Sequence, residues 1–365
     1  MELTRAHFLT SLAVVYLVLA ASPAVSDMTD SCDKMWGNTQ VLYDSTGHQI
    51  MSLTLDRWTT SAFRSKSMYL FGRFDMDIKL VPKDSAGTVT TLYMVTEGPW
   101  QYHDEIDLEF LGNSTGEPYT LHTNIYAKGK GGREKQYRLW FDPTEDFNTY
   151  SIIWNSRNIL ILVNGKPIRR VKNKMRDGYP FPLFQPMRLY ASIWNADDWA
   201  TQGGRIKTDW SQAPFTAFFR NYSATACVPY KTAWICGQGS SDSSWFSQEL
   251  DEDGQRKMQD VDNQYKIYDY CTDSRRFPNG YPQQCGSDSP AHLGITDGKE
   301  VCHGSNSARC HGSGRRKRIP REPRPLESLP QARRLDAVLR RLRAQPRGGD
   351  PGGPRPRLRR GGERT

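Results

Sequence analysis

After the first 26 residues, the sequence has no run of eighteen consecutive apolar residues. It therefore offers no candidate for a transmembrane helix, and we expect no stable membrane insertion. The first residues carry Arg5, followed by an apolar run from Leu12 to Ala21 that ends in small residues. This order is typical of a signal peptide cleaved after Ser26. The sequence therefore predicts a secreted protein whose residues 1–26 are removed.

Cysteine is absent from residues 33–226, which are numerous enough to hold the main core. This core must therefore be stabilised by packing rather than by disulfides. Secretion favours disulfides in the rest of the chain. The odd number of cysteines leaves at least one unpaired; they are Cys32, Cys227, Cys236, Cys271, Cys285, Cys302 and Cys310.

Excess positive charge is missing from most of the chain, although the formal net charge is +9. Residues 303–365 hold 18 Lys and Arg against 5 Asp and Glu, an excess of 13 positive charges, which leaves residues 1–302 with a net charge of −4. A nucleic-acid-binding face needs basic residues on the folded body. We therefore expect no nucleic-acid partner.

Helical periodicity is also scarce between residues 36 and 171, where short alternating strands are separated by turn residues. Residues 71–80 alternate apolar and polar side chains, as a strand with one buried face does. Residues 159–163 and 166–171 flank Asn164-Gly165, which favours a type I′ hairpin turn. We predict an all-β jelly-roll sandwich over residues 27–214.

The composition changes twice towards the C-terminus. Residues 215–285 contain four cysteines and a predicted helix over residues 247–258, so we expect a small extension stapled by disulfides. Residues 286–365 are rich in Gly, Pro, Arg and Ser, which predicts a disordered basic tail. Alternatively, these residues come from a shifted reading frame or an unspliced intron, or they bind anionic pectin. The tail contains two Cys-His pairs, Cys302-His303 and Cys310-His311, in a Gly- and Ser-rich segment with no packed structure expected around them. We therefore expect no metal site and no cofactor.

Acidic and apolar residues alternate strictly from Glu105 to Phe110. On a strand, Glu105, Asp107 and Glu109 therefore share one face. Residues four apart are roughly 13 Å apart at Cα. Two glutamates leaning together can approach the ~5–5.5 Å carboxyl separation of retaining glycosidases. A solvated edge strand and a calcium-binding acidic row are the alternatives.

Residues 103–112, His-Asp-Glu-Ile-Asp-Leu-Glu-Phe-Leu-Gly, resemble the signature of the plant xyloglucan endotransglucosylase/hydrolases, a branch of glycoside hydrolase family 16. This chain departs from that signature in Leu108, where the family usually has Phe. The resemblance extends over residues 36–285 and implies a curved jelly roll with an open cleft across one sheet. It also implies catalytic roles for three residues: Glu105 as nucleophile, Asp107 as its supporting residue and Glu109 as general acid/base.

The same resemblance implies six substrate-binding residues, which are Tyr93, His122, Asn124, Trp194, Trp199 and Arg276. Core packing of the tryptophans, a structural histidine and a surface arginine are the alternatives. The resemblance further implies the disulfides Cys227–Cys236 and Cys271–Cys285. The sequon at residues 113–115 matches the family's glycosylation site at Asn113.

The activity that the resemblance implies is that of a xyloglucan endotransglucosylase in the cell wall. Such an enzyme cleaves the β-1,4-glucan backbone by a retaining mechanism and transfers the cut end to a xyloglucan or oligosaccharide acceptor, with minor hydrolysis. We expect a monomer. The alternatives are a family 16 β-glucan hydrolase and, from another class of protein, a non-catalytic lectin on the same fold.

Overall fold

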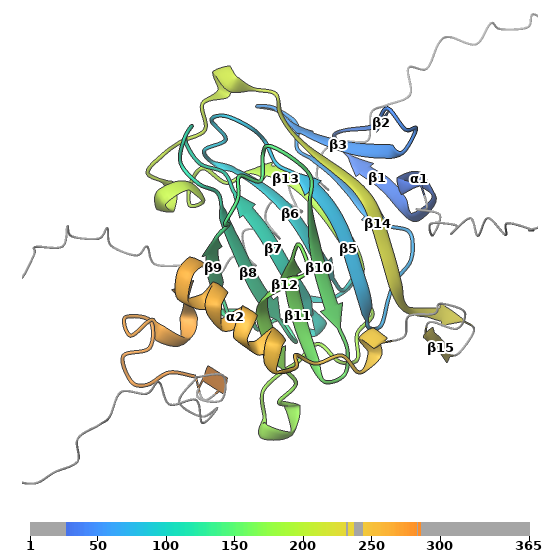
Figure 1. Ribbon diagram of the computed structural model, residues 1–365, viewed down its shortest axis with the longest axis vertical. Coiled ribbons are helices and arrows are strands. Elements are labelled where there is room, and N and C mark those ends of the chain that lie inside the picture. The colour runs from blue at the N-terminus through green and yellow to red at the C-terminus, as the bar shows by residue number, and fades with distance from the viewer. Residues whose placement is uncertain (1–26, 231–232, 237–243, 283, 286–365) are drawn as a thin grey trace, which may run out of the picture. The chain divides into compact units, whose positions relative to one another are not determined.

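The computed structural model describes residues 27–230, 233–236, 244–282 and 284–285, which form two antiparallel β-sheets with few helices (Figure 1). The first sheet has eight strands, in the order β1 (Cys32–Trp36), β4 (Ser61–Ser65), β13 (Arg188–Asn195), β6 (Thr88–Val95), β7 (Glu105–Leu111), β8 (Thr120–Tyr126), β9 (Lys135–Arg138) and β16 (Lys266–Asp269). The all-β jelly-roll class is confirmed.

The second sheet also has eight strands. Seven lie in the order β12 (Lys166–Lys172), β11 (Asn158–Val163), β10 (Asn148–Trp154), β5 (Gly72–Lys79), β14 (Phe215–Tyr230), β3 (Gln49–Leu55) and β2 (Asn38–Tyr43), and β15 (Ala233–Cys236) pairs with β14. The described helices are α1 (Met28–Ser31), α2 (Glu252–Tyr265) and six short 3-10 helices: Trp100–Tyr102, Met175–Asp177, Thr201–Gly204, Trp210–Gln212, Ser244–Phe246 and Tyr270–Thr272.

The hydrophobic core contains apolar side chains from both sheets. On β7, Ile106, Leu108 and Phe110 are fully buried, and the Phe110 ring meets Tyr150 of β10 edge to face at 4.6 Å. Burial of large side chains such as these contributes about 1.5–3 kcal/mol each. Because the apolar residues of β7 are held in this core, its acidic residues must emerge on the opposite face of the first sheet.

Local sequence patterns account for several strands. β5 alternates buried and partly buried residues along its whole length, as predicted. β11 and β12 form the expected hairpin, and Asn164 and Gly165 adopt φ of 49° and 73°. Both values lie in the left-handed region that a type I′ turn requires.

β14 begins at Phe215, the first residue that we assigned to the extension, and it pairs with both β5 and β3. The sandwich therefore includes residues beyond Pro214. The predicted helix over residues 247–258 is shifted: α2 begins at Glu252, where the Asp251 side chain accepts a hydrogen bond from Gly254 N at 2.7 Å, and it ends at Tyr265. α2 packs against β12.

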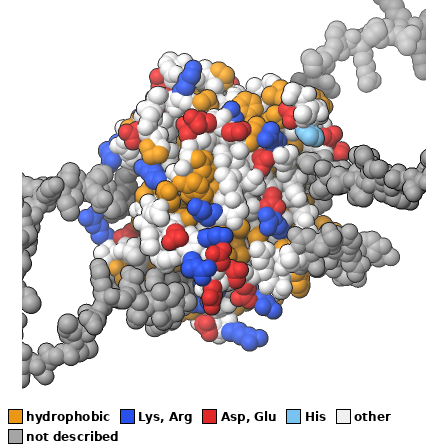
Figure 2. Space-filling view, viewed as in Figure 1, with side chains coloured by type: hydrophobic (Ala, Val, Ile, Leu, Met, Phe, Trp, Pro, Cys, Tyr) orange, Lys and Arg blue, Asp and Glu red, His pale blue; other side chains and the backbone are white. Residues whose placement is uncertain are grey.

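The other face of α2 is polar. Asp253 pairs with Lys257 at 2.7 Å and with Arg256 at 3.1 Å. Figure 2 shows charged side chains of both signs gathered where α2 lies in Figure 1. Val261, in contrast, is buried. The helix is therefore amphipathic, with one face on the sandwich and the other in solvent.

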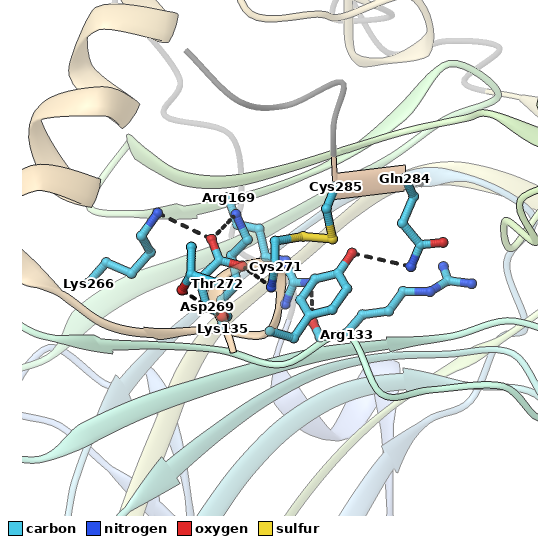
Figure 3. The surroundings of a disulfide bond; sticks show 10 residues. Arg133, Lys135, Arg169, Lys266, Asp269, Cys271, Thr272, Gln284 and Cys285 are labelled. Carbon is cyan, nitrogen blue, oxygen red and sulfur yellow. Dashed lines mark hydrogen bonds and ion pairs between the residues drawn. A yellow bond between two sulfur atoms is a disulfide. The ribbon is translucent and has the colours of Figure 1, made fainter. Parts of the chain in front are cut away.

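The cysteines of the extension behave largely as expected. Cys271 and Cys285 form a disulfide (Figure 3). Cys227 is disulfide-bonded, and Cys236 is its partner in the register of β14 and β15. Cys32 is a buried free thiol within the described part of the chain, and burial raises its pKa to about 12.

The predicted signal peptide and basic tail lie outside the described residues. Within the described part of the chain, no helix is long and apolar enough to cross a membrane.

Candidate active site

β7 places Glu105, Asp107 and Glu109 on one face of the first sheet, as the alternating sequence predicted. Glu105 and Asp107 are only 4% and 8% exposed. This burial argues against the alternative of a solvated edge strand. A buried charge must be neutralised or paired, so these carboxylates cannot all be ionised independently of one another.

Asp107 is the carboxyl group of this strand whose pKa is raised by its surroundings. Burial, followed by the charges of Glu105 and Glu109, holds the pKa of Asp107 well above its usual range. Asp107 also forms a side-chain hydrogen bond with Glu105. The arrangement fits a protonated Asp107 that donates to an ionised Glu105.

A histidine lies beside each glutamate. His103 Nε2 is 2.7 Å from Glu105 Oε2, and His122 Nε2 is 3.7 Å from Glu109 Oε2. Gln136 Nε2 lies 2.9 Å from His122 Nδ1 and can only donate, so the proton of a neutral His122 belongs on Nε2, towards Glu109. Burial lowers the pKa of His122 to about 4, which keeps the ring neutral near pH 6.

Tyr93 and Asn124 flank Asp107 on the neighbouring strands, where the register places each directly opposite it. The Tyr93 ring stacks on Tyr190 of β13 at 5.4 Å. Asn124 Oδ1 accepts hydrogen bonds from Ile125 N and Arg133 N at 2.9 and 3.0 Å. These bonds fix the amide, and its buried Nδ2 has no hydrogen-bond partner within the described part of the chain.

Two tryptophans lie near Glu109, at one end of the row of carboxylates formed by Glu105, Asp107 and Glu109. Trp194 projects from β13, and its ring lies 6.1 Å from Trp199 in the following loop. Trp199 in turn lies 6.4 Å from His122. Trp194 is 7% exposed, yet it does not belong to the core between the sheets.

The loop that carries Trp199 is anchored by Thr201. Its hydroxyl accepts a hydrogen bond from Gly87 N at 2.7 Å and donates one to Gly112 O at 2.8 Å. A Cβ at Gly112 would lie only 2.0 Å from Ser85 O, so this close approach requires glycine. The anchor therefore fixes Trp199 relative to the end of β7.

Arg276 lies at the opposite edge of the sheet. Its Nη1 donates to Glu134 Oε2 at 2.5 Å, just before β9. The preceding strand β16 holds Asp269, which pairs with Lys135 of β9 at 3.0 Å (Figure 3). The extension thus adds a strand to the first sheet and brings Arg276 to it.

Asn113 begins the predicted glycosylation sequon directly after Gly112. It is 9% exposed, and its Nδ2 donates to Pro118 O at 3.1 Å. Its glycosylation stays a prediction. Among the described residues there is no cluster of three His, Cys, Asp or Glu side chains that could hold a metal ion.

Four further residues near the row were not identified from the sequence, namely Trp100, Gln136, Tyr190 and Tyr268. Gln136 and Tyr268 continue the cross-strand row of Glu109 and His122. Their positions depend on strand register, which the sequence does not specify between distant segments. The contact between Trp100 and His103 had one signal in the sequence, which is an aromatic residue three positions before the histidine.

Comparison with known proteins gives two family matches. The model of glycosyl hydrolases family 16 matches residues 28–212, and that of the xyloglucan endo-transglycosylase (XET) C-terminus matches residues 240–285. The chain is 51% identical to xyloglucan endotransglucosylase protein 1 of Diospyros kaki, over 69% of this chain and 85% of that protein. It is 49% identical to xyloglucan endotransglucosylase/hydrolase protein 22 of Arabidopsis thaliana, over 76% of this chain and 98% of that protein.

One solved structure, of a native glycosidic hydrolase, aligns with 54% of this chain and 90% of its own, at 25% identity and a TM-score of 0.42.

Proposed function

The chain belongs to glycosyl hydrolases family 16, and we propose that it is a xyloglucan endotransglucosylase acting in the plant cell wall. Its substrates are a xyloglucan donor and a xyloglucan or oligosaccharide acceptor. The observation that carries the mechanism is the hydrogen-bonded Asp107–Glu105 pair on the same strand face as Glu109. The xyloglucan endo-transglycosylase C-terminus supports the choice of substrate.

In the first step, Glu109 gives its proton to the glycosidic oxygen while the Glu105 carboxylate forms a bond to the anomeric carbon. The bond between this carbon and the glycosidic oxygen breaks, and the leaving sugar departs with a hydroxyl. The donor end is then an ester on Glu105. Asp107 retains its proton and orients Glu105.

In the second step, Glu109 is a carboxylate and accepts the proton of an acceptor hydroxyl. The acceptor oxygen bonds to the anomeric carbon as the ester to Glu105 breaks. Water is present at ~55 M, so a sugar prevails only if it is held in place, which gives it a large effective molarity. We propose that Trp194, Trp199 and Arg276 bind the acceptor sugar. The donor sugar is then contacted by Tyr93, His122 and Asn124.

The residues before Asp27 fit a secretion signal, so we propose that the mature enzyme is released from the cell. We also propose that it acts as a monomer. Its acid/base pair needs no metal or cofactor.

The test is incubation of the purified protein with xyloglucan and a labelled xyloglucan oligosaccharide. The label should enter polymer faster than new reducing ends appear. Steady release of reducing ends without incorporation would show a hydrolase instead. Binding without either product would show a lectin. Glu105→Gln serves as the inactive control, because it keeps the shape of the side chain and removes the nucleophile.

A further inference from the structure

His103 lies two residues before the proposed nucleophile and is held in a fixed orientation. The Trp100 ring stacks on the imidazole at 4.4 Å with an interplanar angle of 24°, and Tyr126 meets it edge-on at 5.8 Å. The backbone is fixed as well, because His103 N donates to Trp100 O at 3.0 Å and Gly129 N donates to His103 O at 2.7 Å. The imidazole therefore has little freedom to rotate.

The stacked Trp100 ring is itself packed on Gly129. A Cβ at Gly129 would lie 2.9 Å from Trp100 Nε1 and 2.8 Å from Trp100 O, and Gly129 has φ of 72°. Only glycine is free of strain in this conformation and at this approach. Trp100, His103 and Gly129 therefore form one packed unit beside Glu105.

This unit aims His103 Nε2 at Glu105 Oε2, 2.7 Å away, and the two side chains are only 13% and 5% exposed. Glu105 also forms a hydrogen bond with Asp107, whose raised pKa makes it the protonated partner. Glu105 is then the ionised partner, and a carboxylate oxygen can only accept. The contact is therefore a charge-assisted N–H···O⁻ bond donated by His103.

We propose that His103 is a positioning residue that assists the departure of Glu105 from the glycosyl-enzyme. This inference rests on the proposed role of Glu105 as nucleophile. A donor to the free carboxylate stabilises it relative to its ester, in which the oxygen carries less charge. Breakage of the ester to an acceptor sugar regenerates that carboxylate, so the His103 bond favours this second step. Without the bond, the ester accumulates.

Two substitutions separate the hydrogen bond from the bulk of the ring. In His103→Gln, the amide nitrogen can occupy the place of Nε2, and in His103→Asn it can reach only the place of Nδ1. With xyloglucan as donor and limiting acceptor, we expect His103→Asn to lower kcat about tenfold, the effect of one charge-assisted bond, and to lower KM with it. His103→Gln should restore most of kcat.

The measurement that decides is mass spectrometry of the intact enzyme during turnover. His103→Asn should carry a covalent glycosyl adduct in a several-fold larger fraction of molecules than the wild type or His103→Gln. Trp100→Ala, which frees the imidazole, should increase the adduct in the same direction. A loss of kcat with no rise in adduct in both His103→Asn and Trp100→Ala would overturn the proposal.

Thermal unfolding of each variant identifies damage to the fold. If His103→Asn does not fold, Trp100→Ala and His103→Gln still decide by their adduct levels. The inference fails separately from the proposed function. Glu105→Ala must abolish both turnover and adduct if Glu105 is the nucleophile, and activity in that variant would reject the catalytic assignment itself.

Discussion

Burial separates the carboxylates of β7 from an ordinary row of surface acids. Glu105 and Asp107 are almost inaccessible, and the pKa of Asp107 is raised by burial and by the neighbouring Glu105 and Glu109 charges. A shared proton between Asp107 and Glu105 keeps one negative charge where an anomeric carbon can be attacked. Glu109 lies on the far side of Asp107 and contacts a neutral histidine, so the two glutamates have different surroundings and can have different roles.

Substitution of the two glutamates should give distinct kinetic results. Glu105→Ala should lower turnover on the order of 10³-fold or more on every substrate, because no ester can form. Glu109→Ala should lose about 10²–10⁴-fold on xyloglucan but much less in the first step on an activated aryl glycoside, whose leaving group needs no proton. Initial rates on both substrates test this. Glu145→Ala, at an exposed glutamate, is the control. Equal losses in Glu109→Ala on both substrates would contradict its role as acid.

His122 predicts a pH dependence of stability. Its pKa is lowered from 6.5 to about 4 in the folded state by burial. Between these values the unfolded chain binds a proton that the folded protein does not, so stability is fully present above pH 6.5 and falls as the pH falls towards 4. The effect is roughly 3 kcal/mol. Urea unfolding of wild type and His122→Gln across this range should show the variant losing less stability; parallel curves would refute the assignment.

The sequence predicted that the three carboxylates share one face of a strand, because strand alternation is a local property. The residues that contact them are a different matter. Gln136 reaches His122 across a strand pair, and Glu134 meets Arg276 from 142 positions away. Such contacts depend on the register between distant strands, which no local pattern in a single sequence specifies. His103 was visible as a residue, but its hydrogen bond to Glu105 depends on the stack with Trp100.

At the scale of elements, the hairpin at Asn164-Gly165 was predictable because its turn needs particular residues. The bounds of α2 were not. Asn155 donates to the backbone oxygens of Trp245 and Gln248 at 2.9 and 3.0 Å. These long-range bonds hold residues 245–248 outside the helix, which begins only after the Asp251 cap. A tertiary contact has thus overridden local helix propensity.

The loop after β13 predicts how the products are divided. Thr201 anchors it to Gly87 and Gly112, which holds Trp199 near His122. If the indole holds the acceptor sugar, Trp199→Ala should lower incorporation of labelled oligosaccharide several-fold while release of reducing ends changes less. Trp199→Phe, which keeps an aromatic face, should be intermediate. An unchanged ratio of transfer to hydrolysis in Trp199→Ala would mean that this loop does not bind the acceptor.

At the scale of the whole chain, the described fold ends before the strongly basic segment begins. The 63 residues from His303 to the end carry 13 excess positive charges, whereas the preceding residues carry a net charge of −4. The described strands and helices, and the Cys271–Cys285 disulfide, all lie before Gly286. The catalytic fold is therefore expected to need nothing beyond Cys285.

Two truncations test this division. Removal of residues 286–365 should leave the melting temperature and transfer activity close to those of the full chain, because no described contact is lost.

Removal of everything from Lys266 onwards should be damaging. It deletes β16, which pairs with the edge of β9, together with the Asp269–Lys135 and Arg276–Glu134 ion pairs and the disulfide. Loss of the disulfide alone is worth about 2–4 kcal/mol. The same truncation leaves the edge of β9 unpaired beside Gln136, whose side chain contacts His122. We therefore expect a lower melting temperature and little transfer from the shorter protein. If the first truncation unfolds the enzyme, the basic tail is part of the fold; if the second is fully active, the extension does not support the cleft.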